Sequence, residues 1–131
     1  MIKKKVLDPN RIRRIDGGFS FIPHRFISDG FLATLTQKEL LLYLFLIMVS
    51  DRHGLSFYSY DAICSFLQLT LDQYLEARVR LIKKELIAFD GTIFQVLDLP
   101  PKPLKGQKPT DDPATVRQLV MQSLMEAGSG Q

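Results

Sequence analysis

The amino-acid sequence predicts an α+β fold that is mainly α-helical, with a core of three helices and a small antiparallel β-hairpin. Capping residues and the spacing of apolar residues predict two helices around a tight turn within residues 59–87. Asp-Gly at positions 90–91 then separates the apolar runs 87–89 and 92–97. Asp-Gly between two such runs is typical of a hairpin, because the type I′ turn needs positive φ at both central residues.

The helix-turn-helix follows from its capping residues. Ser59 is expected to cap a helix over Tyr60–Leu67, and Gln68–Leu69 would form the turn. Thr70 would then cap a longer helix over Leu71–Ile87. Two helices around a short turn followed by a hairpin is the element order of a winged helix-turn-helix, in which the hairpin is the wing.

The remaining elements complete the predicted domain. Thr36–Glu39 has the pattern of a capping box, which opens an apolar, buried helix over Gln37–Ser50. Phe19–Pro23 alternates like a short edge strand, and the region His24–Leu32 would contain one turn of helix. Leu55–Tyr58 is expected to be a third strand that pairs with the hairpin.

The composition divides the chain into one domain with two extensions. Residues 1–18 form a basic N-terminal arm, and residues 19–99 form the winged helix-turn-helix domain. Residues 100–114 are a linker rich in proline and lysine, and residues 115–131 are a C-terminal amphipathic helix and tail. The apolar side of that last helix would dock on the body or on a second copy, which makes a homodimer a possible assembly.

The chain has the composition of an ordinary cytoplasmic protein. With 131 residues, 46% hydrophobic and 24% charged, it can bury one core. Cys64 is the one cysteine, so no intramolecular disulfide can form and a reducing compartment is expected. The apolar run Leu40–Val49 is too short for a membrane helix, which needs about 20 residues. No signal peptide or membrane segment is expected.

Positive charge is concentrated at the N-terminus. The net charge is +3, yet residues 1–25 hold seven Lys/Arg against two Asp, whereas residues 26–99 hold six Lys/Arg against nine Asp/Glu. Lys3–Lys5 and Arg11–Arg14 are similar to arms that follow phosphates or enter a minor groove, where counterion release supplies affinity. A solubilising tail is the alternative interpretation.

The second helix of the motif separates into an apolar and a polar arc when it is placed on a helical wheel. The polar arc is the candidate DNA-contacting face. Gln73 would bond adenine, Arg80 would contact guanine or phosphate, and Lys83 and Lys84 would contact phosphates. The polar arc holds Asp72, Gln73, Glu76, Ala77, Arg80, Lys83 and Lys84.

The carboxylates of this helix oppose a role in DNA contact. Asp72 and Glu76 would lie at the groove end of the helix, where carboxylates repel phosphates. The polar arc could equally be the solvated face of an amphipathic helix. Arg78 falls inside the apolar arc and is expected to be half-buried, with its head group paired to a carboxylate.

Several runs of residues resemble a known family. Phe21-Ile22-Pro23, the helix entered from Leu35-Thr36 and the Asp51–Gly54 loop resemble the start of the winged-helix domains of bacterial plasmid and phage replication initiators. The pairs Leu81-Ile82 and Leu86-Ile87 before the wing agree with that pattern. The resemblance covers about residues 19–99 and implies a winged-helix fold with DNA as the partner.

The pattern departs from the family at the turn. Gln68 stands where the turn usually has a small glycine, and Leu71-Asp72 stands where basic residues usually follow the second cap. The segment from Leu86 to Pro100 also resembles small helix-turn-helix proteins encoded with mobile elements. The resemblance therefore implies the fold more strongly than it implies the DNA contacts.

The sequence offers no constellation for catalysis. His24, His53 and Cys64 are too few to build a structural zinc site of four Cys/His ligands within one chain. Cys64 lies mid-helix, where a buried, inert thiol is more usual than a nucleophile paired with His53. No phosphate-binding glycine loop is present. We expect no enzyme activity, no cofactor, no metal and no small-molecule substrate.

The sequence therefore predicts a non-enzymatic protein that binds double-stranded DNA, either as a replication initiator or as a transcriptional regulator, and that is associated with a mobile element in one interpretation. The alternative is a protein-interaction or dimerisation scaffold that does not contact DNA directly. The residues expected to contact DNA are Arg11, Arg13, Arg14, Gln73, Arg80, Lys83 and Lys84.

Overall fold

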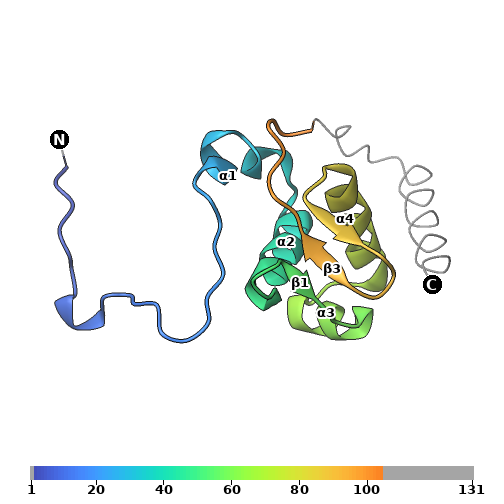
Figure 1. Cartoon of the computed structure of the whole chain (residues 1–131), viewed down its shortest axis with the longest axis horizontal. Helices are drawn as coiled ribbons and strands as arrows, with labels where there is room; N and C mark the ends of the chain where they lie inside the picture. The colour runs from blue at the N-terminus through green and yellow to red at the C-terminus, as the bar shows by residue number, and fades with distance from the viewer. Residues whose placement is uncertain (1, 105–131) are drawn as a thin grey trace.

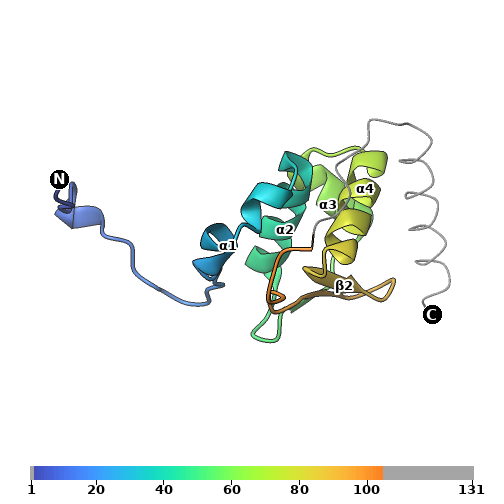
Figure 2. The ribbon, with the colours of Figure 1, turned by 90° about the horizontal axis from the view of Figure 1, so that it is seen from above.

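The computed structural model describes residues 2–104, which form a mainly helical α+β body and an extended N-terminal arm (Figure 1). A layer of helices covers one face of a small sheet (Figure 2). The described elements are the 3-10 helices η1 (Pro9–Arg11) and η2 (Leu32–Thr34), the helices α1 (Arg25–Ser28), α2 (Gln37–Val49), α3 (Tyr60–Leu67) and α4 (Leu71–Lys83), and the strands β1 (Leu55–Ser56), β2 (Ile87–Phe89) and β3 (Phe94–Val96).

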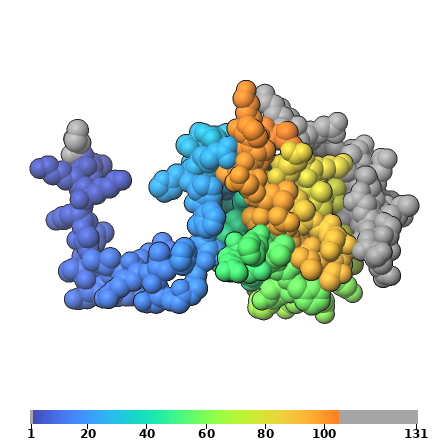
Figure 3. All heavy atoms as spheres, in the orientation of Figure 1, coloured from blue at the N-terminus to red at the C-terminus, as the bar shows by residue number. Residues whose placement is uncertain are grey.

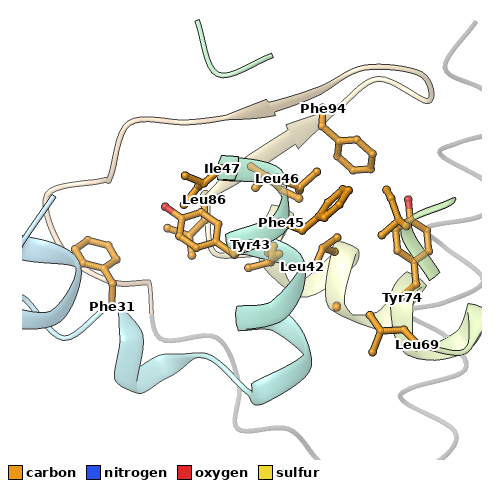
Figure 4. Packing of buried hydrophobic residues seen from close by; sticks show 14 of the residues in the cluster. Phe31, Leu42, Tyr43, Phe45, Leu46, Ile47, Leu69, Tyr74, Leu86 and Phe94 are labelled. Carbon is orange, nitrogen blue, oxygen red and sulfur yellow. The ribbon is translucent and has the colours of Figure 1, made fainter. Parts of the chain in front are cut away.

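Helix α2 is the centre of the core, as its apolar sequence predicts. The hydroxyl of Thr36 accepts a hydrogen bond from the backbone N–H of Glu39, which fixes the start of the helix. The helix packs against α4 and against β3. Figure 4 shows its side chains among residues of the other elements. The core contains Phe26, Phe31, Leu42, Tyr43, Phe45, Leu46, Ile47, Ile63, Leu69, Tyr74, Leu75, Ala77, Leu81, Leu86, Ile87, Phe94 and Leu99.

The two helices around the tight turn begin where the sequence predicts them. Gln68 adopts the left-handed conformation, with φ of 55°, and ends α3. Thr70 and Gln73 then form a complete capping box at the start of α4. Ser59 occupies the N-cap position of α3, but its side chain makes no capping hydrogen bond.

Helix α4 is shorter than predicted: it ends at Lys83, whereas the sequence predicts a helix as far as Ile87. Glu85 takes a left-handed conformation with φ of 58°, and the N–H of Leu86 bonds the carbonyl of Leu81. This C-terminal turn redirects the chain, so that Ile87 begins β2.

The sheet is antiparallel with the strand order β1-β3-β2, which confirms the predicted hairpin and third strand. Ile87 lies opposite Val96 and Phe89 lies opposite Phe94. The predicted type I′ turn is wrong, because Gly91 has positive φ while Asp90 does not. Instead the Asp90 carboxylate accepts hydrogen bonds from the N–H groups of Thr92 and Ile93, and these bonds lower its pKa.

The segment before α1 is extended but forms no strand, so the edge strand expected at Phe19–Pro23 is wrong. The described sheet consists of β1, β3 and β2, and this segment pairs with none of them. The predicted turn of helix is present as α1. Its Arg25 donates hydrogen bonds to the carbonyls of Leu99 and Pro100, which ties α1 to the chain that leaves β3.

Two predictions fall partly or wholly outside the described residues. The linker is described only as far as Leu104, and the predicted C-terminal helix and the predicted dimer contact lie outside the described residues. Among the described helices, none has the length and apolar character needed to cross a membrane.

Candidate nucleic-acid interface

More of the surface of helix α4 is buried than expected for a helix with one apolar and one polar arc. It packs against both α2 and α3. Asp72 and Lys83 are exposed, and Gln73, Glu76 and Arg80 are half-buried, so the polar arc is only partly open to solvent. The buried residues of the helix are Tyr74, Leu75, Ala77, Arg78, Val79 and Leu81.

Gln73 has a structural role at the start of α4. Its side-chain oxygen accepts a hydrogen bond from the N–H of Thr70 at 3.0 Å, and its own N–H donates to the Thr70 hydroxyl at 3.1 Å. A base contact by this amide would therefore compete with the capping box.

Arg80 lies beside a carboxylate on the same helix. Its guanidinium is 2.9 Å from the Glu76 carboxylate, and only 11% of its side chain is exposed. Both residues line a cavity of about 270 Å³ between α4 and the N-terminal end of α2. Glu76 neutralises the charge of Arg80 locally, which weakens any attraction to phosphate.

Lys84 does not lie on an exposed arc, so the prediction of its position is wrong. The residue is 8% exposed, and its ammonium donates to the Glu39 carboxylate and, at 2.6 Å, to the carbonyl of Thr34. Glu39 is 1% exposed. The ion pair joins the end of α4 to the start of α2, and both charges are compensated inside the protein.

The position of Lys84 could have been inferred from residue spacing. Ala77, Leu81 and Lys84 follow the i, i+4, i+7 pattern of one helical stripe, and the first two are buried against the core. The predicted polar arc nevertheless includes both Ala77 and Lys84. The partner, Glu39, was interpreted from its sequence only as a capping-box residue.

Arg78 is more deeply buried than predicted, with 4% exposure. Its guanidinium lies 4.6 Å from the ring centroid of Phe89 and 5.4 Å from that of Tyr74. It also donates a hydrogen bond to the Tyr74 hydroxyl at 3.3 Å. These contacts connect α4 to the wing-like hairpin and make Arg78 part of the structural framework.

The arm presents its basic residues to solvent. Arg11, Arg13 and Arg14 are exposed, and within residues 2–104 none of them forms an ion pair. Asp8 caps the short η1 helix by accepting a hydrogen bond from the N–H of Asn10 at 3.0 Å. The arm stands away from the body in the space-filling view (Figure 3). Its cations are therefore accessible to an anionic partner.

The three residues considered for catalysis lie on different elements. Cys64 is on α3 and His53 is in the loop after α2, while His24 precedes α1. Burial and the negative charge of Asp61 raise the pKa of the Cys64 thiol, which disfavours the nucleophilic thiolate. Within the described part of the chain, no group of three His, Cys, Asp or Glu side chains is placed to hold a metal ion.

Comparisons with protein-family models, with curated proteins and with solved structures find no match to this chain. A functional conclusion must therefore come from the fold and from the accessible charges. Of the seven predicted DNA contacts, the three arm arginines and Lys83 are exposed, whereas Gln73, Arg80 and Lys84 are engaged within the protein.

Proposed function

We propose that the chain is a winged helix-turn-helix protein that binds double-stranded DNA and catalyses no reaction. Its described elements run helix, strand, helix, helix, strand, strand from α2 to β3. A tight turn of left-handed Gln68 joins α3 to α4, and the hairpin follows directly. This order and the three-stranded antiparallel sheet support the proposed fold.

The observation that carries DNA binding is the cationic arm ahead of this motif, whose arginines form no ion pair within residues 2–104. Arg11, Arg13 and Arg14 are exposed on an extended segment, and no carboxylate of the described body pairs with them. Guanidinium groups on such a segment can follow a phosphate backbone, and the release of counterions supplies the free energy of binding.

Helix α4 has a smaller role in this proposal than the sequence suggested. Asp72 is exposed, and Glu76 is already paired with Arg80, so the helix surface is not strongly positive. Lys83 is its one exposed cation within the helix bounds. Binding should therefore depend mainly on phosphate contacts and only weakly on base sequence. A protein that binds DNA in this way is suited either to the initiation of replication or to the control of transcription.

A salt series of duplex titrations tests this function. Fluorescence anisotropy of a labelled duplex should show binding by the full chain that weakens steeply with salt. Four phosphate contacts predict a slope of log K against log salt near −3.6, hence a loss on the order of 100-fold between about 50 and about 200 mM. Absence of binding at the lowest salt, or an affinity independent of salt, would contradict the proposal.

A second function, protein interaction without DNA contact, is favoured by an exposed apolar surface on α2 and α3. Leu41, Met48 and Phe66 are 44%, 68% and 67% exposed. The Phe66 ring packs on Phe45 with centroids 5.7 Å apart, which joins the two helices into one surface. A chain that binds no duplex and sediments as a dimer would favour this second function.

A further inference from the structure

A cavity of about 260 Å³ lies where the arm meets the body. Its walls are the extended segment 19–23, the loop 50–54 and the chain 96–99 that leaves β3. The loop is held against β3, because the N–H of Val96 donates to the carbonyl of Gly54 at 2.8 Å. A pocket of this volume is slightly smaller than those that take drug-sized ligands, which are about 300 Å³ or more.

The buried side chains that line the cavity are apolar apart from one hydroxyl. Ile47 and Leu99 are buried there, and Tyr43 is 2% exposed. Within residues 2–104 the Tyr43 hydroxyl forms no hydrogen bond, and Figure 4 shows it pointing away from the centre of the core. Burial raises the pKa of Tyr43 to about 12, so the group is a neutral donor.

The outer wall carries two exposed aromatic rings. Phe19 is 68% exposed and Phe21 is 77% exposed, and both line the cavity. They follow the three exposed arginines of the arm along one extended stretch of chain. Cationic residues that track a backbone, together with exposed rings on which bases stack, are the features of proteins that bind unpaired nucleic acid.

The charges at the rim disfavour a phosphate inside the cavity. Asp51 and Asp98 both line it, against one cationic side chain, Arg52. The Asp51 carboxylate accepts hydrogen bonds from the N–H groups of His53 and Leu55, and these bonds lower its pKa, so it stays ionised. Arg52 donates to His53 at 3.3 Å. Such a site favours a neutral planar group with N–H donors over an anion.

We infer that this cavity takes one unpaired nucleobase of a strand whose phosphates follow the arm. The base stacks on Phe19 or Phe21, and the Tyr43 hydroxyl donates to an acceptor on its edge. This inference rests on the proposed DNA binding and deepens it, because it assigns the protein to DNA that contains an unpaired base.

Three labelled probes of one sequence test the inference: a perfect duplex, the same duplex with one unpaired thymine, and the single strand. We expect the full chain to bind the probe with the unpaired thymine about tenfold tighter than the perfect duplex. Titration with an RNA strand of the same sequence shows whether the chain binds an unpaired base of DNA or of RNA more tightly.

Substitutions of cavity residues test whether the preference for the unpaired thymine arises in the cavity. Phe19→Ala/Phe21→Ala should abolish the tenfold preference and leave the affinity for the perfect duplex unchanged, since the arginines remain. Tyr43→Phe, which removes only a hydroxyl that has no hydrogen-bond partner among the described residues, should reduce the preference several-fold. Phe57→Ala is the control, because Phe57 is 67% exposed and does not line this cavity.

The outcomes separate the two proposals. Equal affinity for the perfect and the interrupted duplex, or a preference that survives the double phenylalanine substitution, overturns the base-binding inference and leaves duplex binding intact. Failure to bind any of the probes at low salt overturns both.

Discussion

Replacing Lys84 by methionine is expected to lower the free energy of unfolding by about 3–5 kcal/mol. The substitution removes the ammonium group that compensates the Glu39 carboxylate, which is 1% exposed. It also leaves the carbonyl of Thr34 without this donor. Urea unfolding of the full chain, followed by circular dichroism, measures the loss.

The neighbouring lysine provides the control. Lys83 is exposed, so Lys83→Met should change the free energy of unfolding by less than about 0.5 kcal/mol. The double variant Glu39→Gln/Lys84→Met should recover part of the loss, because it removes the buried uncompensated charge. A similar cost for Lys83→Met and Lys84→Met would contradict the buried ion pair.

Replacing Arg13 and Arg14 by alanine is expected to reduce duplex affinity on the order of 100-fold at about 50 mM salt. Each phosphate contact adds about 0.9 to the dependence of log K on log salt, so the slope should become shallower by about 1.8. Both side chains are exposed and form no ion pair within residues 2–104, so protein stability should not change. Anisotropy titrations over a salt series give both quantities.

A body variant with the same charge loss is the matched control. Lys38 and Lys102 are exposed and lie outside the arm. Lys38→Ala/Lys102→Ala lowers the net charge by the same amount and should leave the salt slope nearly unchanged. Equal losses from the two double variants would show that only net charge matters and that the arm makes no localised contacts.

Local signals account for the parts of the fold that the sequence predicts. Thr36 and Thr70 each cap a helix that begins at the next residue, because capping depends on hydrogen bonds within one turn. The hairpin position follows from Asp90-Gly91 in the same way. The type of turn does not follow from these two residues. The Asp90 carboxylate accepts hydrogen bonds from the N–H groups of Thr92 and Ile93, which a two-residue turn does not require.

The boundaries and exposed faces depend on contacts distant in sequence. Apolar spacing continues through Leu86, yet α4 stops at Lys83, since the chain must turn there for Ile87 to pair with Val96. Lys84 is polar and sits on a charged arc of the wheel, but its partner, Glu39, is 45 residues away. A helical wheel contains no information on the pairing of Ile87 with Val96 or on which residue pairs with Lys84.

The candidate site, too, is predicted only where it depends on local sequence. The exposure of the arm arginines follows from their number and from the absence of apolar periodicity around them. The cavity between the arm and the body does not follow from sequence, because it joins residues near positions 20, 50 and 97 only after folding. The alternation around Phe19 and Phe21 predicts an edge strand, and a strand of that kind gives no reason to expect both rings to be exposed.

The central claim is that the arm, rather than the capping end of α4, makes the principal contact with DNA. Chemical-shift mapping of the ¹⁵N-labelled full chain, titrated with an unlabelled duplex, tests it most directly. The account predicts the largest shifts at Arg11, Arg13 and Arg14, a smaller one at Lys83, and little change at Gln73. Largest shifts at Gln73 and along the start of α4, or no shifts in the arm at saturating duplex, would contradict it.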